Sequence, residues 1–250
     1  MNTITALWAR GVVRILRNRA AVISATFIPG IFLVCFYSVF SDATAIFGID
    51  YATFLFPAAV MQVIIFTAGG SALEVALDHE NGIHARLATM SIHPSQIVTG
   101  RLLADTTRAI ISGGIVTAVA AFLGAGVDDG VWRIGVVFLI FLLLTLAFCA
   151  GFCGLSLLGR KPTSTALLIQ SLVMPFIIFS TAFIPAEALS SSVRPFITHM
   201  PLSPILDSVR VIMTGSDLDR GTTIEAAVWL VVLAILAIIG FSAAFSKERK

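Results

Sequence analysis

Six long apolar runs dominate this chain, and each is close to the length that a helix needs to cross a bilayer. They cover residues 20–41, 51–73, 102–127, 135–159, 163–184 and 225–245. A helix spans the hydrocarbon core with about 20 consecutive apolar residues. Charged residues make up only 12% of the chain, against about 25% in a typical soluble domain. We therefore expect an all-α, polytopic membrane protein with six transmembrane helices.

The segment before the first run, residues 3–19, has the pattern of an amphipathic helix. Its apolar residues recur at the spacing of one helix face, and they are Ile4, Leu7, Trp8, Gly11, Val12, Ile15 and Leu16. Arg10, Arg14 and Arg17 fall on the opposite face. The pattern predicts an interfacial helix that turns its arginines toward lipid phosphates or a protein partner. A simple positively charged anchor for the next span is the alternative.

The first apolar run also shares features with a signal peptide, because Ala43-Thr44-Ala45 is typical of a cleavage site. Its apolar stretch is, however, about twice as long as the usual signal-peptide core. The arm that precedes it is long as well. We therefore interpret residues 20–41 as the first span, kinked at Pro29.

The basic residues are distributed unevenly between the two sides of the predicted membrane. If the N-terminus is inside, the outer segments hold only Arg133, Arg194, Arg210 and Arg220, which leaves 12 of the 16 basic residues inside. Cytoplasmic segments carry an excess of Lys and Arg. The bias predicts a multi-pass protein of the bacterial cell membrane with both termini in the cytoplasm.

The stretch 185–221 fits neither a span nor a solvated loop. Pro185, Pro195, Pro201 and Pro204 divide it into amphipathic pieces of 8 to 12 residues. Such pieces are too short to cross a bilayer, but they are too apolar for a solvated loop. We expect an extracytoplasmic re-entrant stretch, in which short helices dip into the outer leaflet and return.

The segment 74–101 is a polar island between two apolar runs, on the predicted cytoplasmic side. It holds the acidic residues Glu74, Asp78 and Glu80, a helix-weakening glycine at Gly82, and basic residues that include Arg86. A negative rim of this kind suits docking to another protein. A solvated hairpin that merely joins two spans is the alternative.

Several motifs that imitate catalytic or binding sites fail on their spacing. His79 and His84 are five residues apart, whereas the zinc-protease motif needs them four apart on one helix face. Residues 154–161 imitate a phosphate-binding loop, but the lysine does not directly follow the second glycine, and Pro162 replaces the required Ser or Thr. Cys35, Cys149 and Cys153 lie in apolar runs, where ordinary packing is expected. We therefore expect no metal, no nucleotide site and no catalytic residue in this chain.

The absence of charge at mid-membrane limits how a transporter of this kind could be driven. The middles of all six predicted spans lack Asp, Glu, Lys, Arg and His, although ion-coupled carriers normally need such groups there. The energy for uphill transport would then enter through the polar island. An ion-coupled carrier is therefore disfavoured, and a scaffold or assembly subunit without a transport path remains an alternative.

Polar side chains within the apolar spans are candidates for a substrate path. They are Gln62, Thr67, Gln170, Ser171, Ser180 and Thr181. Buried polar groups in a membrane need partners, and a substrate could be one. Hydrogen bonding between helices, worth about 0.6 kcal/mol for each contact, is an equally good explanation for any one of them.

Two stretches resemble the permeases of type-2 ABC transporters. One is the polar island, with Glu80-Asn81-Gly82 and Arg86-Leu87 followed by Pro94-Ser95. The other is Phe179–Pro185, followed by Pro201-Leu202-Ser203-Pro204 and Asp207-x-x-Arg210. The order of elements resembles that family over essentially the whole chain, and it is most similar to the daunorubicin-resistance type of drug and lipid exporters. The sequence departs from that family at Phe183, because the family often has a Gly-Phe/Phe pair at this place, just ahead of the proline.

This resemblance implies an ATP-driven exporter for an amphiphilic drug-like or lipid substrate. Two six-span chains, identical or sibling, would pair, and each would dock a cytoplasmic ATP-binding subunit that holds ATP and Mg. The coupling residues would be Glu74, Asp78, Glu80, Gly82 and Arg86 of the loop, with Arg10 and Arg14 of the N-terminal helix.

Overall fold

The computed structural model describes residues 3–45, 48, 50–83, 93–127, 130–186, 189–216 and 219–248, and within these ranges its regular structure is entirely helical. The helices are α1 (Thr3–Arg17), α2 (Arg19–Ala45), α3 (Tyr51–Glu80), α5 (Pro94–Phe122), α6 (Val131–Leu158), α7 (Pro162–Ile178), α8 (Arg194–Thr198), α9 (Ser203–Thr214) and α10 (Arg220–Glu248). The all-α polytopic architecture predicted from the sequence is confirmed.

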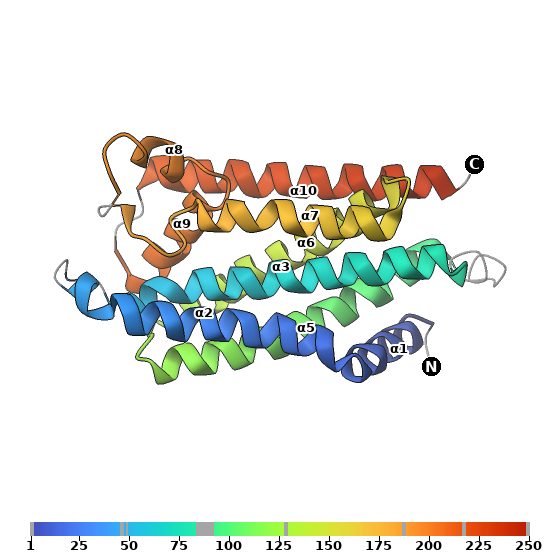
Figure 1. The fold of residues 1–250 in the computed structure, drawn as a ribbon, viewed down its shortest axis with the longest axis horizontal. Coiled ribbons are helices and arrows are strands. Elements are labelled where there is room, and N and C mark those ends of the chain that lie inside the picture. Colours follow the sequence, from blue (N-terminus) through green and yellow to red (C-terminus); the bar gives the residue numbers. More distant parts are fainter. Residues whose placement is uncertain are drawn as a thin grey trace.

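The long helices lie side by side along the long axis of the molecule (Figure 1). Helix α1 and the last turns of α10 lie at one end, which we call the proximal end, together with the end of α3 and the start of α5. Helices α8 and α9 lie at the opposite, distal end. The N-terminal helix and the C-terminal end of the chain are therefore on the same side of the bundle, as an even number of crossings requires.

Among the described residues, five helices are long and apolar enough to cross a membrane: Val22–Asp42, Tyr51–Glu80, Ser95–Phe122, Val131–Leu158 and Arg220–Gly240. The sixth predicted span, 163–184, differs from the structure. Helix α7 has 17 residues, which extend for only about 26 Å. After Ile178 the chain turns instead of continuing as a helix. Pro175 removes one backbone donor near the end of α7, and Pro185 disfavours helical geometry at the residue before it.

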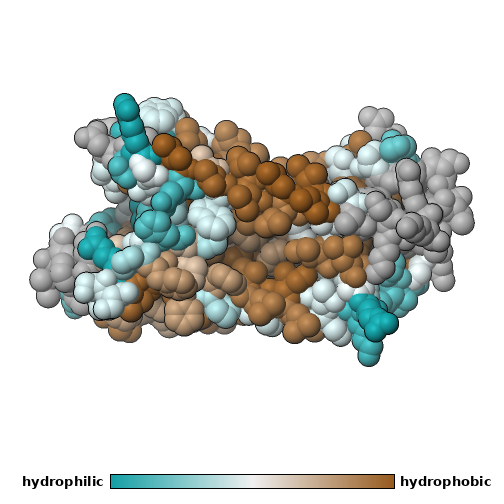
Figure 2. Space-filling model, turned by 90° about the horizontal axis from the view of Figure 1, so that it is seen from above, coloured by the Kyte–Doolittle hydropathy of each residue, from teal (hydrophilic) through white to brown (hydrophobic). Residues whose placement is uncertain are grey.

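A belt of apolar side chains surrounds the middle of the molecule. Figure 2 shows it as a brown band between two more polar ends. Large exposed side chains on α2, α6 and α10 contribute to this surface, for example Phe27, Phe138 and Ile238. An apolar surface of this extent is typical of a protein that faces lipid or another membrane helix.

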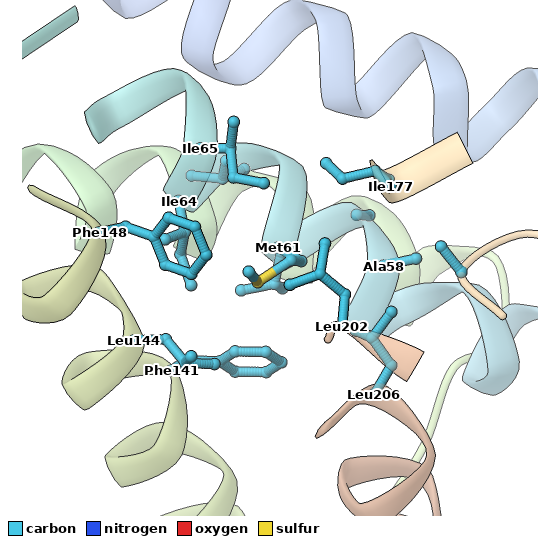
Figure 3. Packing of buried hydrophobic residues seen from close by; sticks show 14 of the residues in the cluster. Ala58, Met61, Ile64, Ile65, Phe141, Leu144, Phe148, Ile177, Leu202 and Leu206 are labelled. Carbon is cyan, nitrogen blue, oxygen red and sulfur yellow. The ribbon is translucent and has the colours of Figure 1, made fainter. Parts of the chain in front are cut away.

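Helix α3 is the centre of the bundle, because the great majority of its residues are buried. Met61, Ile64 and Ile65 of α3 pack among residues from three other helices and the segment before α9. Figure 3 shows those residues as Phe141, Leu144 and Phe148 of α6, Ile177 of α7, and Leu202 and Leu206 at the start of α9. Because lipid is as apolar as these side chains, close packing holds them together. Any movement of α3 therefore reaches α6, α7 and α9 directly.

The predicted interfacial helix forms as α1, and its apolar face packs on α5. The two helices approach each other closely at two glycines. A Cβ atom added at Gly11 would lie 2.6 Å from Cβ of Ala104, and one added at Gly100 would lie 2.7 Å from Cβ of Leu7. Trp8 adds a hydrogen bond across this interface by donating Nε1–H to Oγ1 of Thr107 at 3.1 Å. Helix α1 is thus fixed to the start of the third predicted span.

The start of α10 illustrates how local chemistry sets the ends of these helices. Oδ2 of Asp219 accepts hydrogen bonds from the backbone N–H and the hydroxyl of Thr222, both at 3.0 Å. A carboxylate in this position satisfies a free donor of the first helical turn. The same hydrogen bonds, led by the backbone N–H of Thr222, hold the pKa of Asp219 below its usual value.

A candidate coupling site at the proximal end

Six charged side chains from α1, α3 and α5 meet at the proximal end and form what we call the proximal charge cluster. They are Arg14 of α1, Glu74 and Asp78 of α3, and Arg101, Asp105 and Arg108 of α5. Three positive charges balance three negative ones. Because all six belong to this chain, the cluster is complete without a partner protein.

Arg14 links the surface helix to α3. Its Nη1 donates to both carboxylate oxygens of Asp78, at 2.8 and 2.6 Å, and its Nε lies 3.8 Å from Oε2 of Glu74. The amphipathic pattern predicted that this arginine faces lipid phosphates or a protein partner, but in the structure it pairs with acids of its own chain. The amphipathic pattern could not reveal this, because Asp78 is 64 residues further along the sequence.

Glu74 is the centre of the cluster, where arginines from two helices converge. Oε2 of Glu74 lies 3.6 Å from Nη2 of Arg101, and Oε1 lies 3.4 Å from Nη1 of Arg108. Both Glu74 and Asp78 are buried. Both acids thus have partners inside the chain, and their contact with basic groups of a docking subunit stays a prediction.

Within α5 itself, one acid is held between two arginines. Asp105 lies 4.0 Å from Nε of Arg101 and 3.6 Å from Nη2 of Arg108. These residues are four and three positions apart, so they share one helix face. Asp105 and Arg108 are each only 2% exposed. Burying such charges is costly unless they are paired, so the balance of the cluster is a condition for its existence.

The cluster extends into the core through backbone and hydroxyl groups of α3. Ser71 donates its hydroxyl to Asp105, and its oxygen lies 3.3 Å from Sγ of Cys153 on α6. Arg108 donates to the carbonyl of Thr67 at 2.6 Å. Thr67 is close to the midpoint of α3. The guanidinium of Arg108 therefore reaches further into the bundle than we expected from its place near the start of a predicted span.

The remaining acid of the polar island connects two helices at the surface. The carboxylate of Glu80, the last residue of α3, accepts from the backbone N–H of Thr163 at 3.1 Å and from its hydroxyl at 2.8 Å. Thr163 is in the first turn of α7, where backbone donors lack helical partners. Glu80 therefore caps α7 and fixes the end of α3 to it.

Beyond Glu80 the chain turns toward the segment between α3 and α5. Gly82 has a φ of +69°, a conformation that glycine adopts more readily than other residues. Helix α3 thus ends two residues before the glycine that the sequence marks as helix-weakening. Arg86 and His84 lie outside the described residues. Arg10, on the outer face of α1, is exposed.

The predicted path residues divide into two groups. Gln62 and Thr67 are buried in α3, and within the part of the chain that the structure describes, Oε1 of Gln62 and Oγ1 of Thr67 have no hydrogen-bond partner. The side chain of Gln170 lies against Gly69 of α3, where an added Cβ would be 2.5 Å from it. Gln170 therefore lies at the α3–α7 interface, whereas Gln62 and Thr67 are buried positions of α3.

The other three path residues already have hydrogen-bond partners within this chain. Ser171 is exposed on α7 and donates to the carbonyl of Leu167 at 2.9 Å. Ser180 and Thr181 are buried in the turn that follows α7 and bind its backbone or the nearby Asp207. Hydrogen bonding within the protein accounts for these polar groups without a substrate.

The comparisons with known proteins agree with this architecture. Residues 2–214 match the family described as ABC-2 type transporter. The chain is 22% identical over 246 residues to the daunorubicin resistance ABC transporter permease protein DrrB1 of Streptomyces coeruleorubidus, and the alignment covers 98% of this chain and 83% of that protein. With the apolar helices already described, the family match shows a multi-pass membrane protein of a transporter, not an enzyme. The chain belongs to the ABC-2 type transporter family.

Proposed function

We propose that this chain is the membrane subunit of an ATP-driven exporter that moves an amphiphilic drug-like or lipid molecule out of a bacterial cell. A separate cytoplasmic subunit binds ATP and Mg and docks at the proximal end. Family membership and the similarity to a drug-resistance permease support this proposal. The observation that carries it is the proximal charge cluster, because it ties the surface helix α1 to two spans.

The proposed coupling residues divide into those outside the proximal charge cluster and those within it, and the two groups have different tasks. Arg10, Glu80, Gly82 and Arg86 belong to the surface and loop that would meet the ATP-binding subunit. Arg14, Glu74 and Asp78 instead pass a displacement of α1 or of the loop into α3 and α5. Since α3 packs on α6, α7 and α9, a push at the proximal end reaches the core of the bundle.

One cavity formed by described residues bears on where a substrate could pass. A cavity of about 80 Å³ lies between α3, α5 and α9, and its lining includes Phe56, Ala120 and Met213. Pockets for drug-sized ligands usually measure about 300–1,000 Å³. This cavity is therefore too small for such a substrate. We propose that the path lies between two membrane chains, identical or sibling, with Gln62, Thr67 and Gln170 nearest to it.

The first experiment tests docking and coupling separately. The chain is co-expressed with the ATP-binding subunit of its transporter, purified, and reconstituted in liposomes with a fluorescent amphiphile such as daunorubicin. Arg10→Glu should reduce copurification of the ATP-binding subunit. Arg14→Gln should leave the subunits associated but lower ATP-dependent export at least about tenfold, since a charged hydrogen-bonded pair is worth about 1.5–3 kcal/mol. Arg194→Gln, at the distal end, is the matched control.

Two outcomes would contradict the proposal. Unchanged copurification and export in both proximal variants would remove the coupling role of this surface. Export that continues with ATP hydrolysis blocked, and stops when the proton gradient is dissipated, would identify an ion-coupled carrier. The proton-gradient measurement is needed because Asp105 and Arg108 are buried charged residues, and ion-coupled carriers use such groups. Failure of the parent complex to export any tested amphiphile would favour a scaffold subunit.

A further inference from the structure

The distal end contains a short non-helical segment that lies among helices. After α7 ends, residues 179–184 turn back toward α9. Ala182 and Phe183 of this segment are buried. Non-helical backbone at membrane depth is tolerated only where the protein itself satisfies its donors and acceptors. The partners of this segment therefore show what holds the distal end together.

Side chains from two helices, α3 and α9, satisfy the backbone of the turn. The hydroxyl of Tyr51, at the start of α3, donates to the carbonyl of Phe183 at 2.8 Å. Oγ of Ser203, at the start of α9, accepts from the N–H of Thr181 at 3.1 Å and donates to the carbonyl of Ile197 at 2.6 Å. The turn is thus bound to α3 on one side and to α9 on the other.

Arg210 of α9 makes the most extensive set of these contacts. Its Nε donates to the carbonyl of Phe54 at 3.0 Å, and its Nη2 donates to the carbonyl of Ala182 at 3.0 Å. Its Nη1 donates to Oδ1 of Asp207 at 2.6 Å. The guanidinium also lies 3.6 Å from the centre of the Phe54 ring, a cation–π contact. One side chain therefore joins α3, the turn and α9.

Asp207 completes this arrangement from the preceding turn of α9. The same Oδ1 accepts from the hydroxyl of Thr181 at 3.0 Å, so the carboxylate binds both the turn and the guanidinium. Arg210 is only 8% exposed, and its donors point to backbone carbonyls and a carboxylate of its own chain. This geometry fits a structural brace and does not fit a residue that waits for a substrate.

We propose that Arg210, oriented by Asp207, is the positioning residue of a distal closure unit, made of residues 51–54, the turn 179–184 and α9. The unit moves as one body and keeps the interior behind α9 closed from the outside. Opening during transport then separates this unit from its surroundings, and α9 does not swing away from α3. The inference takes the outward orientation of the distal end from the proposed function, but it does not depend on ATP-driven export.

The test measures access to a buried position on the inner face of the unit, where α9 packs on α3. A cysteine is introduced by Leu206→Cys, a site that is 1% exposed, in a chain in which the exposed Cys35 is replaced by serine. A second probe, Ala76→Cys, reports on the buried proximal half of α3. Whole cells are treated with a membrane-impermeant maleimide to probe the distal position, and opened membranes are treated in parallel so that the reagent can also reach the proximal position. The chain without an introduced cysteine gives the background from the buried Cys149 and Cys153.

The parent protein should label slowly at both probes. Arg210→Gln should raise the labelling rate at the Leu206→Cys probe at least about tenfold, because hydrogen bonds from a charged donor are lost, and leave the Ala76→Cys probe unchanged. Arg210→Lys should give an intermediate rate, since an ammonium cannot reproduce the planar fork of contacts. Arg194→Gln, exposed on the neighbouring α8, should match the parent.

Each other result overturns the proposal. An unchanged rate at the distal probe in Arg210→Gln would show that the brace does not close the interior. A rise at both probes would show a general loss of folding instead of local opening. If Arg210→Gln is not recovered from the membrane, the same two criteria apply to Arg210→Lys. Because the readout is accessibility of a cysteine and not export, loss of export in the proximal variants leaves this result independent.

Discussion

Glu74 is the residue on which the proximal charge cluster depends most. Its Oε2 faces Arg14 of α1 and Arg101 of α5, and its Oε1 faces Arg108 of α5. Glu74 is only 9% exposed. Charges this well buried persist only because they are matched. The local part of the cluster, in which Asp105 lies three or four positions from two arginines, could be predicted from the sequence. The contacts of Glu74 with Arg14 and Arg108 could not, because they join segments far apart in the chain.

Neutralising this residue should destabilise the fold. Glu74→Gln leaves one more positive than negative charge in the cluster, and we expect a loss of about 3–5 kcal/mol, the range for removing one partner of a buried ion pair. Chemical denaturation in detergent, followed by tryptophan fluorescence, measures this loss. Glu225→Gln is the control, since its pair with His199 is largely exposed.

The double variant Glu74→Gln with Arg108→Gln restores the balance of charge. It should lose clearly less stability than the sum of the two single variants, because the two residues are coupled. Strict additivity would show that the two side chains do not act on one another.

At the scale of elements, the hydropathy pattern predicted where helices form better than where they end. Helix α3 continues to Glu80, seven residues beyond the predicted span, because its polar end is paired with α1, α5 and α7. Helix α7 stops at Ile178, before the predicted end, because side chains of other elements satisfy the turn that follows. Both differences arise from tertiary hydrogen bonds, which a window of apolar residues cannot report.

The crossing of α1 over α5 should be sensitive to added volume at one glycine and tolerant at another. Gly100→Ala places a Cβ 2.7 Å from Leu7, so we expect a destabilisation of about 1–3 kcal/mol, as in other overpacked sites. In the same helix, Gly113 has no atom within 4 Å of an added Cβ. Gly113→Ala should be neutral or should stabilise by about 0.5–1 kcal/mol. Thermal unfolding in one detergent compares the two, and equal shifts would contradict the close crossing.

At the scale of the whole molecule, α1 and the last turns of α10 lie at the same end of the bundle. This placement and the apolar belt agree with the even number of apolar runs in the sequence. The family and the polytopic fold could be predicted from the sequence. The burial of α1 against α5 could not be predicted, because an amphipathic stripe fits a protein surface as well as a lipid surface. The pair of Arg210 with Asp207 is local, but the contacts of Arg210 with other elements were hidden, because those acceptors are backbone carbonyls of Phe54 and Ala182, which no side-chain pattern marks.

The orientation of the molecule gives a further prediction. Ser192→Cys, exposed at the distal end, should react with an impermeant maleimide added to intact cells. Asn18→Cys, exposed between α1 and α2, should react only after the cells are opened. Cys35 is replaced by serine in both variants. The reverse pattern would place the proximal charge cluster outside the cell and refute the docking of an ATP-binding subunit there.

The pairing of Arg14 with Asp78 sets an order on biosynthesis. The ribosome makes α1 first, yet its partners on α3 and α5 follow after 60 or more residues, since they include Asp78, Gly100 and Ala104. Until those residues have been translated, Arg14 must remain solvated at the bilayer surface. The N-terminal helix therefore locks in place late, once the third span has entered the membrane, and a chain truncated before that point would leave it undocked.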